Sequence, residues 1–185
     1  TTSSKRFFPD LNTVTAGDLS NQWEVLPSVG RTMRFGVTVR DNNVNVGQTA
    51  SAETVLTVDA NSGPFVVTSQ TTPEIWSAGT SQTITWDVAN TNVSPINASQ
   101  VNILLSLDGG FTFPITLASK IANNGLYEVV VPNNTTKLGR IKVESDGNIF
   151  YAINSANISI QASEFIMNFD FLSLDVCEPN NAVYT

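Results

Sequence analysis

The sequence has no histidine and a single cysteine in 185 residues, and these two absences exclude several kinds of site. Without an imidazole side chain, the chain cannot form a Ser-His-Asp or Cys-His catalytic site or an H-E-x-x-H zinc helix. One cysteine, Cys177, can neither close an internal disulfide nor build a thiolate metal cage. We expect Cys177 to be an inert thiol, with a disulfide to a cysteine beyond residue 185 as the alternative.

Charge is also scarce. Charged side chains make up 14% of the chain, and sixteen acidic residues against nine basic ones give a net charge of −7. This balance disfavours nucleic acid and anionic membrane surfaces, because both attract basic faces. No apolar run approaches the roughly 18 residues of a membrane-spanning helix, and residues 1–6 do not resemble a signal peptide. We therefore expect no nucleic-acid partner and no membrane insertion.

Thr, Ser and Asn are abundant instead, and apolar residues alternate with polar ones at a period of two. This alternation occurs in residues 35–40, 54–58, 82–87, 100–105, 126–131, 140–144 and 157–160. Such segments are typical of strands with one face in a core and the other in water. Turn clusters of Asn, Asp and Gly separate them, because these residues tolerate a positive φ. The sequence predicts an all-β fold, in which residues 119–122 are the one candidate for a helical turn.

The central part of the chain has the strand spacing of an immunoglobulin-like or fibronectin-like sandwich. We predict strands near residues 64–69, 74–76, 82–88, 100–106, 111–117, 125–131, 139–144, 149–153 and 156–161. Inward-facing positions of these strands should form much of the core: Trp86, Ile103, Leu105, Val129, Val131, Ile141, Val143, Ile158 and Ile160.

A weak internal repeat indicates the module boundaries. Residues 37–58 and 141–160 both contain two alternating segments around a polar excursion, and each is followed by a polar joint and a phenylalanine. We interpret residues 1–62 as a partial β-sandwich module and 63–161 as a complete Ig-like β-sandwich. Residues 162–185 are then the start of a further module or a C-terminal extension. The prediction is tandem immunoglobulin/fibronectin-like β-sandwich modules, the first and last incomplete.

The last of these segments has its own alternating pattern, in which Phe165, Met167, Phe169 and Phe171 occupy every second position. An apolar strand without a partner is prone to pair with a neighbouring chain. We therefore interpret the chain as a fragment of a modular protein.

The sharpest local motif is an Asp-box, S-x-D-x-G-x-T-[FW], formed by Ser106, Asp108, Gly110, Thr112 and Phe113. In a tight hairpin, Asp108 can accept hydrogen bonds from turn amides while the following phenylalanine anchors the turn in the core. The functional alternative is a glycosidase, because the motif recurs in sialidase-type propellers. Propellers need several repeated blades and this chain has one box, so we favour a structural turn.

Asp41, Asn43 and Asn45 alternate along a predicted loop and resemble a calcium-binding loop, since Ca²⁺ prefers several oxygen ligands from a flexible turn. The pattern departs from an EF-hand because the glycine, Gly47, arrives one position late and strands flank the loop. Repeated Asn and Asp also occur in plain hairpin turns. We favour the plain turn and keep structural calcium as the alternative; no other cofactor is expected.

Trp23 and Trp76 are the candidate ligand contacts, because both lie beside prolines in loop-like segments where an exposed ring could stack on a sugar. Trp86 alternates with Ile84 and is expected in the core instead. For Trp23 and Trp76, burial in the fold is the more ordinary alternative.

The order of several short motifs resembles one known family. The first six motifs are RFFPDL (6–11), WEVLP (23–27), GRTM (30–33), TVRDN (38–42), GQTA (47–50) and GPF (63–65). They are followed by ITWD (84–87), residues 101–113, VP (131–132), NIF (148–150) and DVCEP (175–179). In this order they resemble the region downstream of the catalytic domain in large secreted zinc metalloproteases of the bacterial reprolysin-like group. The resemblance covers nearly the whole chain and implies a secreted Gram-negative protein that continues on both sides.

The catalytic part of that family does not carry over, because its zinc helix needs histidines that this chain lacks. The expected function is therefore a non-catalytic extracellular accessory region that acts as a spacer or as a protein- or glycan-binding module. Its partners would be the other domains of the parent chain and an extracellular protein or glycan, at a secreted or cell-surface location. The alternative is a cell-adhesion or carbohydrate-binding module of a surface protein.

Overall fold

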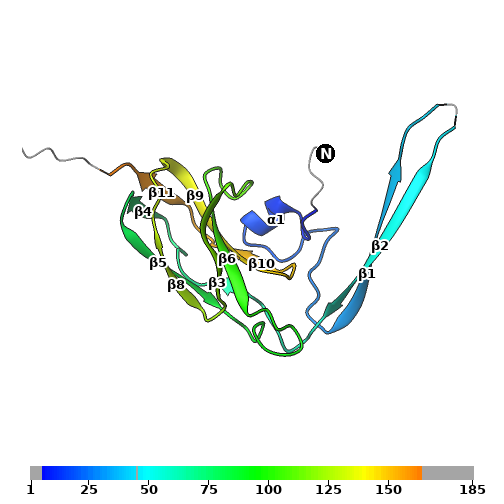
Figure 1. Cartoon of the computed structure of the whole chain (residues 1–185), viewed down its shortest axis with the longest axis horizontal. Coiled ribbons are helices and arrows are strands. Elements are labelled where there is room, and N and C mark those ends of the chain that lie inside the picture. The colour runs from blue at the N-terminus through cyan, green and yellow to red at the C-terminus, as the bar shows by residue number, and fades with distance from the viewer. Residues whose placement is uncertain (1–5, 45, 164–185) are drawn as a thin grey trace, which may run out of the picture.

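The computed structural model describes residues 6–44 and 46–163, and this part of the chain is almost entirely β-structure (Figure 1). It contains one short helix, α1 (Leu11–Thr15), and eleven strands. The strands are β1 (Arg31–Arg40), β2 (Thr49–Val58), β3 (Val66–Val67), β4 (Glu74–Ser77), β5 (Ser81–Asp87), β6 (Gln100–Ser106), β7 (Ile115–Ala122), β8 (Leu126–Val130), β9 (Thr136–Ser145), β10 (Tyr151–Ile153) and β11 (Ile158–Gln161). The predicted all-β class is confirmed.

Two sheets form a β-sandwich. One has the strand order β4-β11-β9-β6-β7, with β10 also paired to β9, and the other has the order β3-β5-β8. All neighbours are antiparallel except β4 and β11, which run parallel. This arrangement is the immunoglobulin/fibronectin-like architecture predicted for the central part of the chain.

The core lies between these sheets because alternate side chains of each strand point inward. Val67, Ile84, Trp86 and Val129 from the smaller sheet pack into one cluster with residues of the larger sheet. All nine residues predicted for the core are buried in it: Trp86, Ile103, Leu105, Val129, Val131, Ile141, Val143, Ile158 and Ile160. Burying each such aliphatic side chain contributes about 1.5–3 kcal/mol, so this cluster is the main stabilising element of the sandwich.

One strand begins later than predicted. The segment expected at 111–117 is β7 at Ile115–Ala122, because the turn after β6 extends as far as Pro114, which has no N–H to donate to a strand ladder. Residues 119–122 belong to this strand and pair with β6 through Gln100↔Ala122 and Val101↔Ile121. The alternative of a helical turn at 119–122 is wrong.

The helix α1 was not predicted from the sequence. It is one turn long and begins after Asp10, whose side chain accepts hydrogen bonds from the N–H groups of Asn12 and Thr13. A hydrogen bond from the Thr13 hydroxyl, together with these two backbone bonds, holds the pKa of Asp10 below its ordinary value. Asp at an N-cap stabilises even a short helix because it satisfies free backbone donors.

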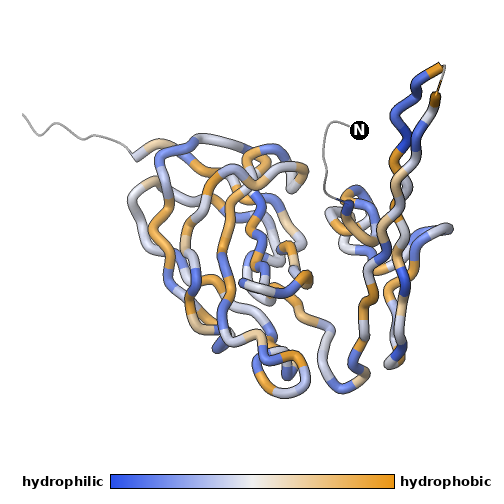
Figure 2. The backbone as a smooth tube through the Cα atoms, turned by 45° about the vertical axis from the view of Figure 1, so that its right-hand side comes forward, coloured by the Kyte–Doolittle hydropathy of each residue, from blue (hydrophilic) through white to orange (hydrophobic). Residues whose placement is uncertain are grey.

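The first two strands form a separate hairpin that projects away from the sandwich (Figures 1 and 2). Its ten residue pairs run from Arg31↔Val58 to Arg40↔Thr49. Among the described residues, this pair shares no backbone ladder with any other strand. The division of the chain at residues 62 and 161 stays a prediction.

Candidate functional site

The loop at the tip of the hairpin contains the predicted calcium ligands. Asp41 Oδ1 accepts hydrogen bonds from the backbone N–H groups of Asn43 (3.1 Å) and Gln48 (3.0 Å). These two bonds, that from Asn43 first, lower the pKa of Asp41. Asn45 lies outside the described residues. Within the described ranges, no group of three or more His, Cys, Asp or Glu side chains is placed to hold a metal ion.

Asp41 thus acts as an acceptor that closes a hairpin loop, and calcium binding at Asp41, Asn43 and Asn45 stays the untested alternative to a plain turn. We expect the thermal midpoint to be the same in excess calcium and in excess chelator, because the Asp41 carboxylate already serves the loop amides. An ion bound only to the folded state must raise the midpoint. A higher midpoint in calcium that Asp41→Asn abolishes would show that the loop binds the ion.

The two candidate tryptophans have opposite environments. Trp23 is 85% exposed, whereas Trp76 is 1% exposed and belongs to the core cluster. The Trp76 indole N–H donates to Glu74 Oε2 at 2.9 Å. The prediction of an exposed, ligand-contacting ring is therefore wrong for Trp76: β4 is a strand with its alternate positions in the core, which an isolated Glu-Ile-Trp-Ser segment does not reveal. Trp23 remains available for stacking.

The Asp-box residues form a closed turn after β6. Asp108 Oδ1 accepts the backbone N–H groups of Phe111 (3.1 Å) and Thr112 (2.9 Å) and the Ser106 hydroxyl (2.6 Å), and Oδ2 accepts the Thr112 hydroxyl (2.6 Å). Ser106 Oγ in turn accepts the Gly110 N–H at 2.8 Å. Asp108 is committed to its own turn, as the structural interpretation of the motif predicts, and not to a catalytic cleft.

Phe113 differs from the prediction because it does not enter the core between the sheets. Its ring is partly exposed and lies under the ammonium group of Lys142, 4.7 Å from the ring centroid. Lys142 is mostly buried and forms an ion pair of 2.6 Å with Glu144. These side chains lie on the outer face of the larger sheet, and their charges are paired with one another rather than directed at a cavity.

Hydrogen bonding makes the Asp108 turn sensitive to acid. Burial opposes ionisation, but the hydrogen bonds from Ser106 and Thr112 and from the Thr112 and Phe111 amides outweigh it and lower the pKa of Asp108 to about 2, from 3.8. A depressed folded-state pKa stabilises the fold above about pH 4, and this contribution is lost as the pH falls towards 2.

We expect Asp108→Asn to lower the free energy of unfolding at neutral pH by about 1 kcal/mol, after allowing for solvent screening of this partly exposed group. The difference from the wild type should shrink as the pH falls from 4 towards 2, as measured by denaturant titration at several pH values. Asp18→Asn, at an exposed position, is the matched control. An Asp108→Asn difference that is constant from pH 7 to pH 2 would contradict the role of the charge.

The N-terminal segment, residues 6–30, connects the hairpin to the sandwich. Phe7 contacts Tyr151 of β10 edge-on, with ring centroids 5.7 Å apart, and Phe8 contacts Phe35 of β1 in the same way at 5.6 Å. Tyr151 is partly buried, and this burial raises the pKa of its hydroxyl to about 12. Neighbouring phenylalanines therefore attach this segment to both parts of the molecule.

The same segment also packs on the Asp108 turn. Gly110 has a φ of +98°, and a Cβ at this position would lie 2.9 Å from Thr15 Cγ2 at the end of α1. The absence of a side chain therefore allows the helix to approach the turn. Within the segment, Glu24 pairs with Arg6 and accepts the Asp10 N–H at 2.7 Å. The segment is thus a folded joint with its own hydrogen bonds.

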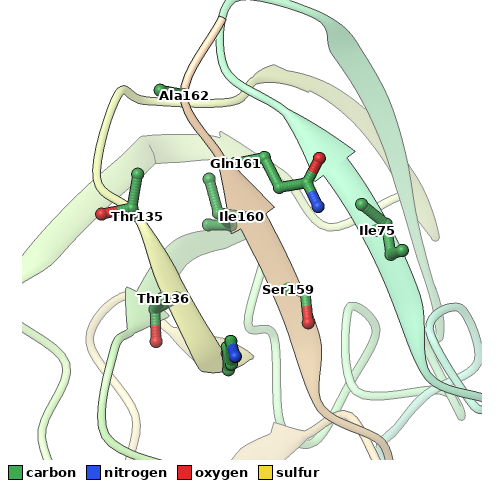
Figure 3. Close-up of a pocket in the computed structure, with 8 residues that line it drawn as sticks. Ile75, Thr135, Thr136, Ser159, Ile160, Gln161 and Ala162 are labelled. Atoms are coloured by element: carbon green, nitrogen blue, oxygen red, sulfur yellow. The ribbon is translucent and has the colours of Figure 1, made fainter.

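A depression of about 460 Å³ lies along β11, open to solvent (Figure 3). It is lined by Ile75, Thr135, Thr136, Lys137, Ser159, Ile160, Gln161 and Ala162. Hydroxyl, amide and ammonium groups can hydrogen-bond a neutral ligand here, but the lining has no carboxylate pair for glycoside hydrolysis and no aromatic ring for sugar stacking.

Comparisons with known proteins give only distant structural similarity. No family model matches the chain, and no curated protein matches it. Fibronectin(III)-like modules of Clostridium thermocellum CbhA match with 15% identity over 55% of this chain and 100% of that one, with a TM-score of 0.35. A chimeric titin Z1Z2 tandem carrying a GRGDS peptide from fibronectin matches with 15% identity over 80% of this chain and 76% of that one, with a TM-score of 0.32. The β-sandwich class rests on the sheets and core of this chain.

Two buried asparagines were not found from the sequence. Asn123 accepts the Trp86 indole N–H at 2.8 Å and donates to Ala98 O at 2.9 Å. Asn154 accepts the Ile141 N–H at 2.8 Å and donates to the backbone oxygens of Gln70 and Ala156. In a chain this rich in Asn, no sequence signal separates these two from surface turn residues.

Proposed function

We propose that the chain is a non-catalytic accessory region of a secreted bacterial metalloprotease, in which the sandwich separates and orients neighbouring domains and presents a surface for protein or glycan. The resemblance of the ordered motifs to the reprolysin-like group supports the parent class. The β-sandwich fold supports the module itself, since such scaffolds project loops without reactive side chains.

The observation that carries the spacer role is the position at which the chain enters and leaves the sandwich. The Gly63 N–H donates to Ala89 O, just beyond the end of β5. The Ala78 N–H donates to Gln161 O, just before the start of β5. Because β5 has seven residues at about 3.3 Å each, the two ends lie about 20 Å apart along the sandwich. The sandwich would therefore hold the residues that follow Gln161 apart from the hairpin that precedes Gly63.

The folded joint of residues 6–30 supports an orienting role. A flexible linker would let an upstream domain rotate freely, whereas the contacts of Phe7 with Tyr151 and of Phe8 with Phe35 attach the joint to the sandwich and to the hairpin. The direction in which an upstream domain joins the sandwich would therefore be restricted.

The purified chain tests the non-catalytic part of the proposal. We expect no hydrolysis of casein or of a mixed peptide library, with or without added zinc, above that of a mock purification. Hydrolysis that follows the chain through successive purification steps and resists inhibitors of host proteases would contradict it. Reading the coding sequence upstream of Thr1 tests the parent class: we expect H-E-x-x-H with a third histidine.

A carbohydrate-binding or adhesion module is the second candidate, favoured by the 85% exposure of Trp23. Stacking on an exposed tryptophan is a common way to hold a sugar because the ring presents a large apolar face with a polar edge. A glycan array with the wild-type chain and Trp23→Ala separates the candidates. Binding that Trp23→Ala removes would favour the glycan module, and an array without binding would leave the spacer role.

A further inference from the structure

We infer that the open edge of β1 binds the acidic segment 164–174 of a second copy of this chain as an antiparallel third strand. This inference does not depend on the proposed function, because it concerns association of the chain with itself. It rests on the amphipathic character of the hairpin, on the charge difference between its strands and on the sequence that follows Ser163.

The hairpin has one apolar and one polar face, since residues opposite each other in the register point to the same side. The apolar face consists of Met33, Phe35, Val37 and Val39 from β1 and Ala50, Ala52, Leu56 and Val58 from β2, with Arg31 and Thr54 as its two polar members. Phe8 covers this face beside Phe35. Further towards the tip, Val37 and Val39 are 58% and 63% exposed.

The outer edge of β1 is free for pairing within the described part of the chain, where β1 has hydrogen-bonded ladder contacts with β2 alone. Two-stranded sheets are marginally stable in water, and an unpaired edge is a template for a further strand. Strand addition to such an edge is a recurrent mode of recognition. The edge therefore offers backbone donors and acceptors beside an exposed apolar face.

The charge of the two strands differs, which favours the β1 edge for an acidic partner. β1 carries Arg31, Arg34 and Arg40 and no acidic residue, whereas the only charged residue of β2 is Glu53. Arg34 forms an exposed ion pair with Glu53 at 2.5 Å. Arg40 is exposed near the tip.

The sequence of residues 164–185 has the complementary composition. It contains four acidic residues, Glu164, Asp170, Asp175 and Glu178, and no lysine or arginine. Its apolar positions Phe165, Met167, Phe169 and Phe171 repeat at a period of two, as do the four apolar positions of β1.

Charge selects the antiparallel register. Placing Phe165 opposite Val39 and Phe171 opposite Met33 aligns all four apolar positions on the apolar face. The same register places Glu164 opposite Arg40 and Asp170 opposite Arg34, so both acidic residues meet an arginine on the polar face. A parallel register with the same apolar overlap would place Leu172 opposite Arg40 and Ile166 opposite Arg34, so the added strand would give neither arginine an acidic neighbour.

The donor must be a second copy. Strand β11 ends at Gln161 beside β4, on the far side of the sandwich from the hairpin in both views (Figures 1 and 2). Glu164 follows Ser163 directly, and one residue spans only about 3.8 Å. The register that pairs Glu164 with Arg40 at the hairpin tip therefore cannot form within one chain.

Sedimentation equilibrium of the full chain and of charge-swap variants tests this pairing. We expect reversible association that weakens about threefold or more in Arg40→Glu and in Glu164→Lys, since a cross-strand ion pair becomes a repulsion. The double variant Arg40→Glu with Glu164→Lys should recover much of the wild-type affinity. Arg31→Glu is the control with the same charge change, because in this register Arg31 faces Ser173 rather than an acidic residue.

A second variant tests the apolar contacts of the proposed strand, so that the result does not depend on the charge swaps alone. Phe169→Asp should abolish association while leaving the thermal midpoint of the sandwich unchanged, because the last strand of the sandwich, β11, ends at Gln161. A chain that stays monomeric at high micromolar concentration would overturn the inference. So would association that Phe169→Asp leaves intact, or a double swap that associates no better than the two single variants.

Discussion

Trp76→Ala is expected to lower the free energy of unfolding by about 3–5 kcal/mol, the range for removing a large aromatic side chain from a packed core. The indole is 1% exposed and lies in the cluster between the two sheets, so its removal leaves a cavity that the surrounding strands cannot close. Its hydrogen bond to Glu74 would also be lost. Urea denaturation at neutral pH measures the change.

Trp23→Ala is the matched control for the same substitution at an exposed position. Because Trp23 is 85% exposed, we expect a change within about 0.5 kcal/mol. Equal destabilisation by the two variants would contradict the assignment of Trp76 to the core and of Trp23 to the surface.

The second large effect is expected at Asn154, which is 1% exposed and joins three backbone segments. Its amide accepts the Ile141 N–H and donates to the oxygens of Gln70 and Ala156. Asn154→Leu leaves these three groups without their partner, and each unsatisfied buried group costs about 1–3 kcal/mol. We expect a total loss of about 3 kcal/mol or more in urea denaturation.

The control for Asn154 is Asn134→Leu, at an exposed turn position, which should change stability by no more than about 0.5 kcal/mol. Asn154→Asp retains the shape and one acceptor oxygen but loses both donors and adds a buried charge. It should therefore destabilise at least as strongly as Asn154→Leu at neutral pH and less in acid, where the carboxyl is protonated. Wild-type stability of either Asn154 variant would contradict the role of this side chain.

Period-two alternation was sufficient to predict the sandwich strands and their core, because a half-buried strand must alternate. Ile141 and Val143, for example, can be assigned to the core from their neighbours in sequence alone, and both have 0% exposure. The structural role of Asp108 in its own turn was also predictable, because its hydrogen-bond partners lie within four residues of it in the sequence.

Features that depend on distant segments could not be predicted. Trp76 lies in a segment predicted as a short strand, but four residues do not show which face of that strand is buried, and the parallel pairing of β4 with β11 places Trp76 in the core. Asn154 is bonded to Gln70, 84 positions earlier in the chain. The contact of Phe7 with Tyr151 spans nearly the whole described chain. No local pattern of residue types contains such information.

The proposed function is tested most directly by proteolysis, because it predicts that this chain is part of a secreted metalloprotease. Antibodies raised against this chain should capture from the culture medium a protein that hydrolyses casein, is inhibited by a metal chelator and regains activity with zinc. Its sequence should contain the histidine-rich zinc motif outside the region described above. A captured parent that contains this chain but has no such motif and no chelator-sensitive proteolysis would contradict the proposed function.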